Sequence, residues 1–143
     1  DTITNQTNAA YVRAQAEETT FSYGGATTTA YGVGNSSLSG NIGSSVAIDS
    51  TQTNGGTGIQ SIANFTGDNG YDAQVSSTAI GNASSGYACS TCQTTMTVRN
   101  TQTNSVDIGA SATATVNTSG RSTRATTTAI GNTGSFYVTR PGP

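Results

Sequence analysis

The sequence predicts an all-β chain, a β-solenoid (β-helix) of three tandem repeats of about 46–50 residues with roughly two coils in each. Two short phrases recur in step along the chain. The phrase QTN begins at Gln6, Gln52 and Gln102, and a second phrase, clearest as AIGN, ends 29 or 30 residues later at Asn35, Asn82 and Asn132. Apolar and polar residues alternate between the two phrases, which is the signature of a β-strand.

The repeats divide the chain into units at residues 5–50, 51–100 and 101–143, all within one domain spanning 1–143. Most apolar residues are Ala, Val and Ile, which suit narrow β interiors better than helix packing. One unit cannot bury its thin apolar face alone. Stacking of the units is therefore expected to form the core.

The first strand of each unit follows QTN. In unit three, alternate residues from Val106 to Val116 are apolar, and the residues between them are mostly polar. In unit one, alternate residues from Ala10 to Ala16 repeat this pattern in the same register. Both stretches predict strands with one face turned inward.

A turn is expected in the middle of each unit. In unit two it falls on GDNG at residues 67–70, where Asn-Gly favours the positive backbone angles of a tight turn. A calcium loop through Asp68 and Asp72 is the alternative, but its ligand spacing is absent and the turn is preferred. A second strand then ends in the AIGN phrase, whose Gly34, Gly81 and Gly131 predict a corner.

The repeated amides predict stacking ladders, in which identical side chains on successive layers hydrogen-bond to one another. The predicted ladder residues are Asn35, Asn82 and Asn132 with Gln6, Gln52 and Gln102. The alternative is that AIGN is simply a strand that ends in a turn. It predicts the same fold.

The two ends of the chain predict a joint between subunits. Phe136, Tyr137 and Val138 form a β-prone run with no following unit to cover it. The first residues, which include Ile3, could supply the missing strand of a neighbouring subunit. A head-to-tail contact of this kind repeats without limit when its rotation does not close.

Cys89 and Cys92 lie in a connection longer than its counterpart in unit one. In an oxidising compartment a local disulfide is the expected state of this pair. A zinc site would need two more ligands, and the chain has no His and no third Cys. No metal site and no cofactor are expected.

Composition narrows the classes of function. The chain has no Lys and no His, and only 8% of its residues are charged. General-base and nucleophilic options are therefore nearly absent, and an enzyme is not expected. The net charge is −2 and the arginines are scattered, so nucleic acid is not an expected partner. No run of residues is apolar enough to span a membrane.

The three QTN phrases and the AIGN phrases resemble the repeats of secreted bacterial surface-fibre proteins, including curlin-type subunits and the holdfast-anchor proteins of stalked bacteria. The resemblance implies a secreted or cell-surface β-solenoid that assembles with copies of itself into adhesive or biofilm-matrix fibres. The alternative is a monomeric surface adhesin, or a module that binds ice or a glycan through a Thr-rich face. A surface or matrix polysaccharide is accordingly a second candidate partner, and glycosylation of the Asn-x-Ser/Thr sites stays open.

Overall fold

The computed structural model describes residues 1–89 and 94–139, and these residues form strands and connecting segments without a helix. The strands are β1 (Thr2–Asn8), β2 (Val12–Ile42), β3 (Val46–Asn54), β4 (Ile59–Cys89), β5 (Met96–Asn104) and β6 (Ile108–Thr139). They form two parallel sheets, with strand orders β1-β3-β5 and β2-β4-β6. The prediction of an all-β chain is confirmed, and the architecture is β-helix-like.

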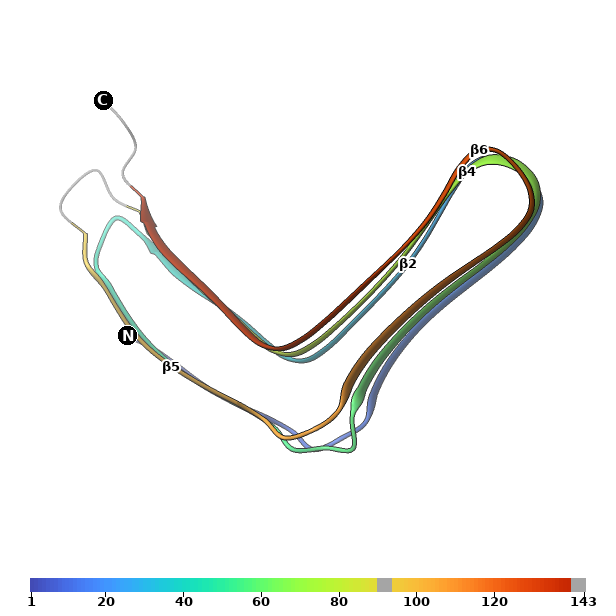
Figure 1. Ribbon diagram of the computed structural model, residues 1–143. Helices are drawn as coiled ribbons and strands as arrows, with labels where there is room; N and C mark the ends of the chain where they lie inside the picture. The colour runs from blue at the N-terminus through green and yellow to red at the C-terminus, as the bar shows by residue number, and fades with distance from the viewer. Residues whose placement is uncertain (90–93, 140–143) are drawn as a thin grey trace, which may run out of the picture.

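Each strand pairs with the corresponding strand of the next unit. Gln6 pairs with Gln52, and Gln52 with Gln102. We call β1 with β2 the first layer, β3 with β4 the second layer, and β5 with β6 the third layer. Figure 1 shows these three layers following one another along the same path.

The predicted two coils in each unit are wrong, because consecutive coils of a solenoid pair with each other and the pairing offset gives the coil length. Thr2 pairs with Ile48, and Val46 pairs with Met96, so the offset is a whole unit. Each unit therefore forms one long layer. Within a layer the outgoing and returning parts of β2, β4 and β6 face each other through side chains instead of pairing.

The predicted tight turn at residues 67–70 is also wrong. β4 continues through this stretch, and the strand curves round and returns (Figure 1). Among the described residues, positive φ angles occur only at Gly43 and Gly58. Gly70 supplies room instead, because a Cβ there would lie 2.3 Å from the Cε1 atom of Tyr23.

The glycines of the AIGN phrase also serve close approach. Pairing between β4 and β6 runs from Ile80–Ile130 to Asn82–Asn132 without a pair at Gly81. A Cβ on Gly81 would lie 2.2 Å from the carbonyl oxygen of Gly131. Only glycine allows the two backbones to come this close.

The layers form two arms joined at a bend (Figure 1). One arm is enclosed by β2, β4 and β6 and has a core of Ala26, Ala30, Ala63, Phe65, Ala73 and Val75. The other arm lies between β1-β3-β5 and the last parts of β2, β4 and β6, with Val46, Ile48 and Ala88 buried at its end. No helix in the described part of the chain is long and apolar enough to cross a membrane.

Candidate functional site

The asparagines of the AIGN phrase form a hydrogen-bonded column. Asn35 Nδ2 donates to Asn82 Oδ1 over 2.8 Å, and Asn82 Nδ2 donates to Asn132 Oδ1 over 2.7 Å. Each donor therefore lies one layer before its acceptor. The column has a direction that runs from the first layer to the third.

The glutamines of the QTN phrase form a second column, which lies on β1, β3 and β5. Gln102 Nε2 donates to Gln52 Oε1 over 2.8 Å, and Gln52 Nε2 donates to Gln6 Oε1 over 2.7 Å. This column runs from the third layer to the first. Gln52 and Asn82 have no exposed surface, so the amide bonds of the second layer are shielded from water.

The two phrases keep step because each binds the backbone beside the other. Gln52 Nε2 donates to the Ala83 carbonyl, and Gln102 Nε2 donates to the Thr133 carbonyl, each over 2.9 Å. In return, Asn82 Nδ2 donates to the Thr103 carbonyl over 2.8 Å. A change in the number of residues between the phrases would break these bonds, so a spacing of about 30 residues is required by the fold.

A third amide column was not predicted. Asn8 Nδ2 donates to Asn54 Oδ1 over 2.9 Å, and Asn54 Nδ2 donates to Asn104 Oδ1 over 2.7 Å. These are the asparagines of the QTN phrases themselves. Each of these asparagines stands two residues after Gln6, Gln52 or Gln102. This repeated spacing is the sequence pattern from which the third column could have been predicted.

Burial differs sharply between the second layer and the two outer layers. Gln52, Asn54 and Ala63 are fully buried, whereas their partners on either side are half-buried. β1 and β5 each have one strand neighbour, β3, and β2 and β6 each have one, β4. The described chain therefore presents two open sheet edges, one on the first layer and one on the third.

The predicted joint residues lie on these outer layers. Phe136 pairs with Gly86 and packs against the core cluster of Val46, Ile48 and Ala88. Tyr137 stacks on Tyr87 at 6.2 Å between ring centroids. Val138, Tyr137 and Ile3 are exposed, with Ile3 at 82%. The structure thus places three of the residues on β6 and the fourth on β1, at opposite ends of the stack.

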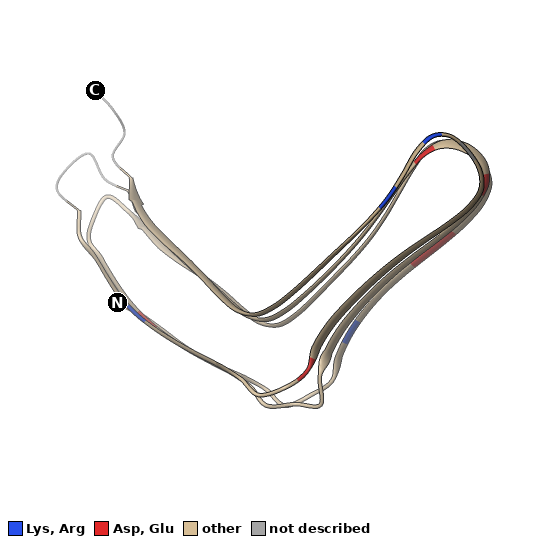
Figure 2. Cartoon of the chain, viewed as in Figure 1, with Lys and Arg blue, Asp and Glu red and all other residues tan. Residues whose placement is uncertain are grey.

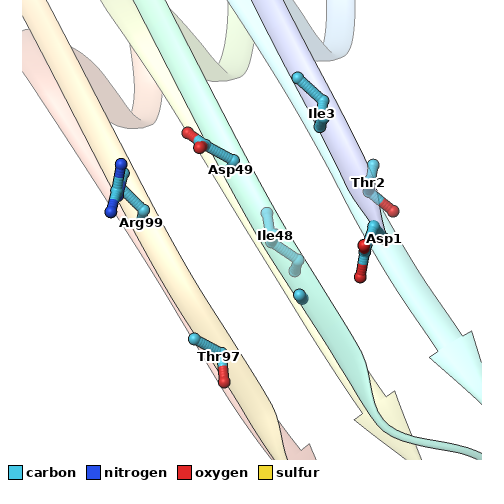
Figure 3. A pocket seen from close by; sticks show the side chains of 8 residues that line it. Asp1, Thr2, Ile3, Ile48, Asp49, Thr97 and Arg99 are labelled. Carbon is cyan, nitrogen blue, oxygen red and sulfur yellow. The ribbon is translucent and has the colours of Figure 1, made fainter.

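A shallow hollow of about 320 Å³ crosses the outer face of β1, β3 and β5. Figure 3 shows Ile3, Asp49 and Arg99 side by side on these three strands. The hollow is a gap between side chains on an open surface.

Cys89 ends β4 and is of intermediate exposure. Cys92 lies outside the described residues. The structure gives the disulfide no support, and the pairing stays a prediction. Threonines face outward in the register column Thr19, Thr66 and Thr115, but the neighbouring outward column, Glu17, Asn64 and Thr113, is mixed.

Charge is divided unevenly among the layers (Figure 2). The described part of the first layer carries Asp1, Glu17, Glu18 and Arg13, and the second carries Asp49, Asp68 and Asp72. The third carries Arg99, Arg121, Arg124 and Asp107. The first layer is therefore net negative and the third layer net positive.

Residues 1–58 match the family of HfaD, holdfast attachment protein D. The matched residues comprise β1, β2 and β3. No curated protein and no solved structure matches the chain. The similarity to curlins stays a prediction, and the family match shows that residues 1–58 are similar to a holdfast attachment protein.

Proposed function

We propose that this chain is the structural subunit of an extracellular adhesive filament, a single β-solenoid domain of three repeats that polymerises end to end by β-strand addition. The main support is the contrast in burial between the layers. The second layer has a layer of the same repeat on both sides, whereas in the described chain each outer layer has one on a single side. A second copy placed in the same register supplies that neighbour.

The joint that fits is head to tail. In it, β5 and β6 of one copy pair with β1 and β2 of the next copy, as they pair with β3 and β4 within their own chain. Asn132 Nδ2 would then donate to Asn35 Oδ1 of the next copy, which continues the direction of that column. A joint between two first layers would reverse this direction.

Charge favours the same arrangement. A head-to-tail joint brings the net negative first layer onto the net positive third layer, whereas two first layers would repel each other. By register, Asp107 would lie one layer and two residues from Arg13 of the next copy. Arg99 would lie at the same diagonal from Asp1. Diagonal neighbours of this kind are within reach of long side chains.

A complementation experiment tests the joint. Arg13→Glu places a second acid opposite Asp107, and Asp107→Arg places a second arginine opposite Arg13. Each variant alone should grow filaments several-fold more slowly than the unaltered chain, because like charges meet at every joint. A mixture of the two variants has opposite charges at both kinds of mixed joint. It should regain the normal rate as an alternating copolymer.

Growth is followed by light scattering and negative-stain electron microscopy, and circular dichroism checks that each variant keeps its β structure. Asp68→Arg is the matched control, since it reverses a charge on β4 in the second layer, which the joint does not touch. Recovery only in the mixture supports head-to-tail assembly. If the unaltered chain stays monomeric under all conditions, the filament proposal is wrong.

A further inference from the structure

One charged residue occupies a position that is otherwise apolar or neutral. The inward side chains of the outgoing strands alternate along each layer, and Glu18 is the single charged member. The series are Val12, Ala14, Ala16, Glu18 and Thr20 in the first layer; Ile59, Ser61, Ala63, Phe65 and Gly67 in the second; and Ile108, Ala110, Ala112, Ala114 and Val116 in the third.

Glu18 lies in register with the core. It pairs with Phe65, which is 1% exposed, and Phe65 pairs with Ala114. Thr28 Oγ1, on the returning part of the same strand, donates to Glu18 Oε2 over 2.7 Å. Glu18 itself is only half-buried, because no layer covers the open edge of the first layer. Water therefore reaches the carboxylate.

The head-to-tail joint would cover this opening. By register, Glu18 would then pair with Ala114 of the second copy, and Thr28 with Ala125. Within its own layer, Glu18 accepts a hydrogen bond from the Thr28 hydroxyl. The ring of Tyr23 is directed toward Phe65. Three nearby charged side chains are exposed on the outer face: Arg13, Glu17 and the second copy's Arg124. At the far bend, Asp72 forms an ion pair with Arg121 and accepts a hydrogen bond from Ser122. Among the described residues, the Thr28 hydroxyl alone donates a hydrogen bond to this carboxylate, which the joint would close off from water.

We propose that Glu18 controls assembly: the joint closes readily only when this side chain is neutral. This inference rests on the proposed filament. A buried charge without a partner of opposite sign is strongly disfavoured, and edge strands are protected from pairing by inward-pointing charges. Closing the joint on a glutamic acid takes up one proton from solution. Because the joined state then binds more protons than the free chain, assembly through this site strengthens as the pH falls.

The test compares the unaltered chain with Glu18→Gln and with the control Glu17→Gln at pH 7 and pH 4. Glutamine keeps the size of the side chain and an oxygen for Thr28. Glu17 is the adjacent acid, but it faces outward and accepts a bond from Gln15. Growth rates are measured by light scattering, and filaments are checked by electron microscopy. Circular dichroism confirms folding, and Glu18→Ala, which copies Ala114 of the third layer, is a second variant without the charge.

At pH 7, Glu18→Gln should assemble at least about tenfold faster than the unaltered chain, while Glu17→Gln should match it. At pH 4, where protons for closing the joint are about a thousandfold more concentrated than at pH 7, the advantage of Glu18→Gln should shrink. Equal growth of all the chains at pH 7 would overturn the control by Glu18 and leave the filament standing. If folded Glu18→Gln and Glu18→Ala stay monomeric at both pH values, the joint itself is wrong.

Discussion

Replacing Asn82 with alanine removes the centre of the asparagine column. The amide is fully buried and takes part in three hydrogen bonds: it donates to the Thr103 carbonyl and to Asn132 Oδ1, and it accepts from Asn35 Nδ2. Each bond contributes about 1 kcal/mol, and a buried group left without its partner costs more than the bond itself contributed. The free energy of unfolding should fall by about 3–4 kcal/mol.

The matched control is Asn132→Ala in the same column. Asn132 accepts from Asn82 and donates to the Gln102 carbonyl over 3.2 Å, but its side chain is exposed. Water can replace both bonds, so the loss should be about 1 kcal/mol or less.

Urea unfolding of the monomeric chain, followed by circular dichroism, measures both variants. At about 2–4 °C per kcal/mol for a chain of this size, Asn82→Ala should also lower Tm by roughly 10 °C. Equal losses for the two variants, or a loss under about 1 kcal/mol for Asn82→Ala, would refute the burial argument.

Two pairs of substitutions test the packing, and a labelling experiment tests the cysteines. Gly81→Ala should lower the free energy of unfolding by at least about 2 kcal/mol, because the new Cβ meets the Gly131 carbonyl. Gly131→Ala should be nearly neutral, since nothing lies within 4 Å of its Cβ. Thermal melts of the two variants that coincide would contradict this. Phe65→Ala should cost about 3–5 kcal/mol and the exposed Phe21→Ala under about 0.5 kcal/mol in urea unfolding. If Cys89 and Cys92 form the predicted disulfide, a thiol reagent should add no mass until reductant is present, and labelling of both without reductant would exclude the bond.

The sequence was sufficient for the all-β class and for the pairing between the repeated phrases of successive units. Alternation identifies the inward face, and identical phrases at matching positions bring Gln52 between Gln6 and Gln102. Alternation also places Glu18 on the inward face, two residues after Ala16. That Glu18 borders an open edge depends on which layer lies outermost, so the role that we propose for it rests on the three-dimensional arrangement.

The coil count could not be predicted in the same way. Two strands joined by a bend can lie side by side in one sheet or face each other across a core, and both arrangements require the same alternation. Here the outgoing and returning parts of β4 face each other, as the contact of Ala63 and Phe65 with Ala73 and Val75 shows. Room for the bend comes from Gly67 and Gly70 beneath the ring of Tyr23, a contact between two layers that no local pattern records.

The proposed filament changes what a mutation at an outer layer should cost. In the single chain, Asn132 is exposed, whereas a further layer would give it the surroundings that Asn82 has now. Asn132→Ala should therefore be mild in the monomer and costly in the filament, where the alanine would face Asn35 of the next copy at every joint. Assembly should begin only at a concentration about tenfold higher than for the unaltered chain, since one buried bond at the joint is worth about 1–2 kcal/mol. Sedimentation of filaments over a concentration series measures this threshold. An unchanged threshold would show that the asparagine column does not continue from one copy to the next.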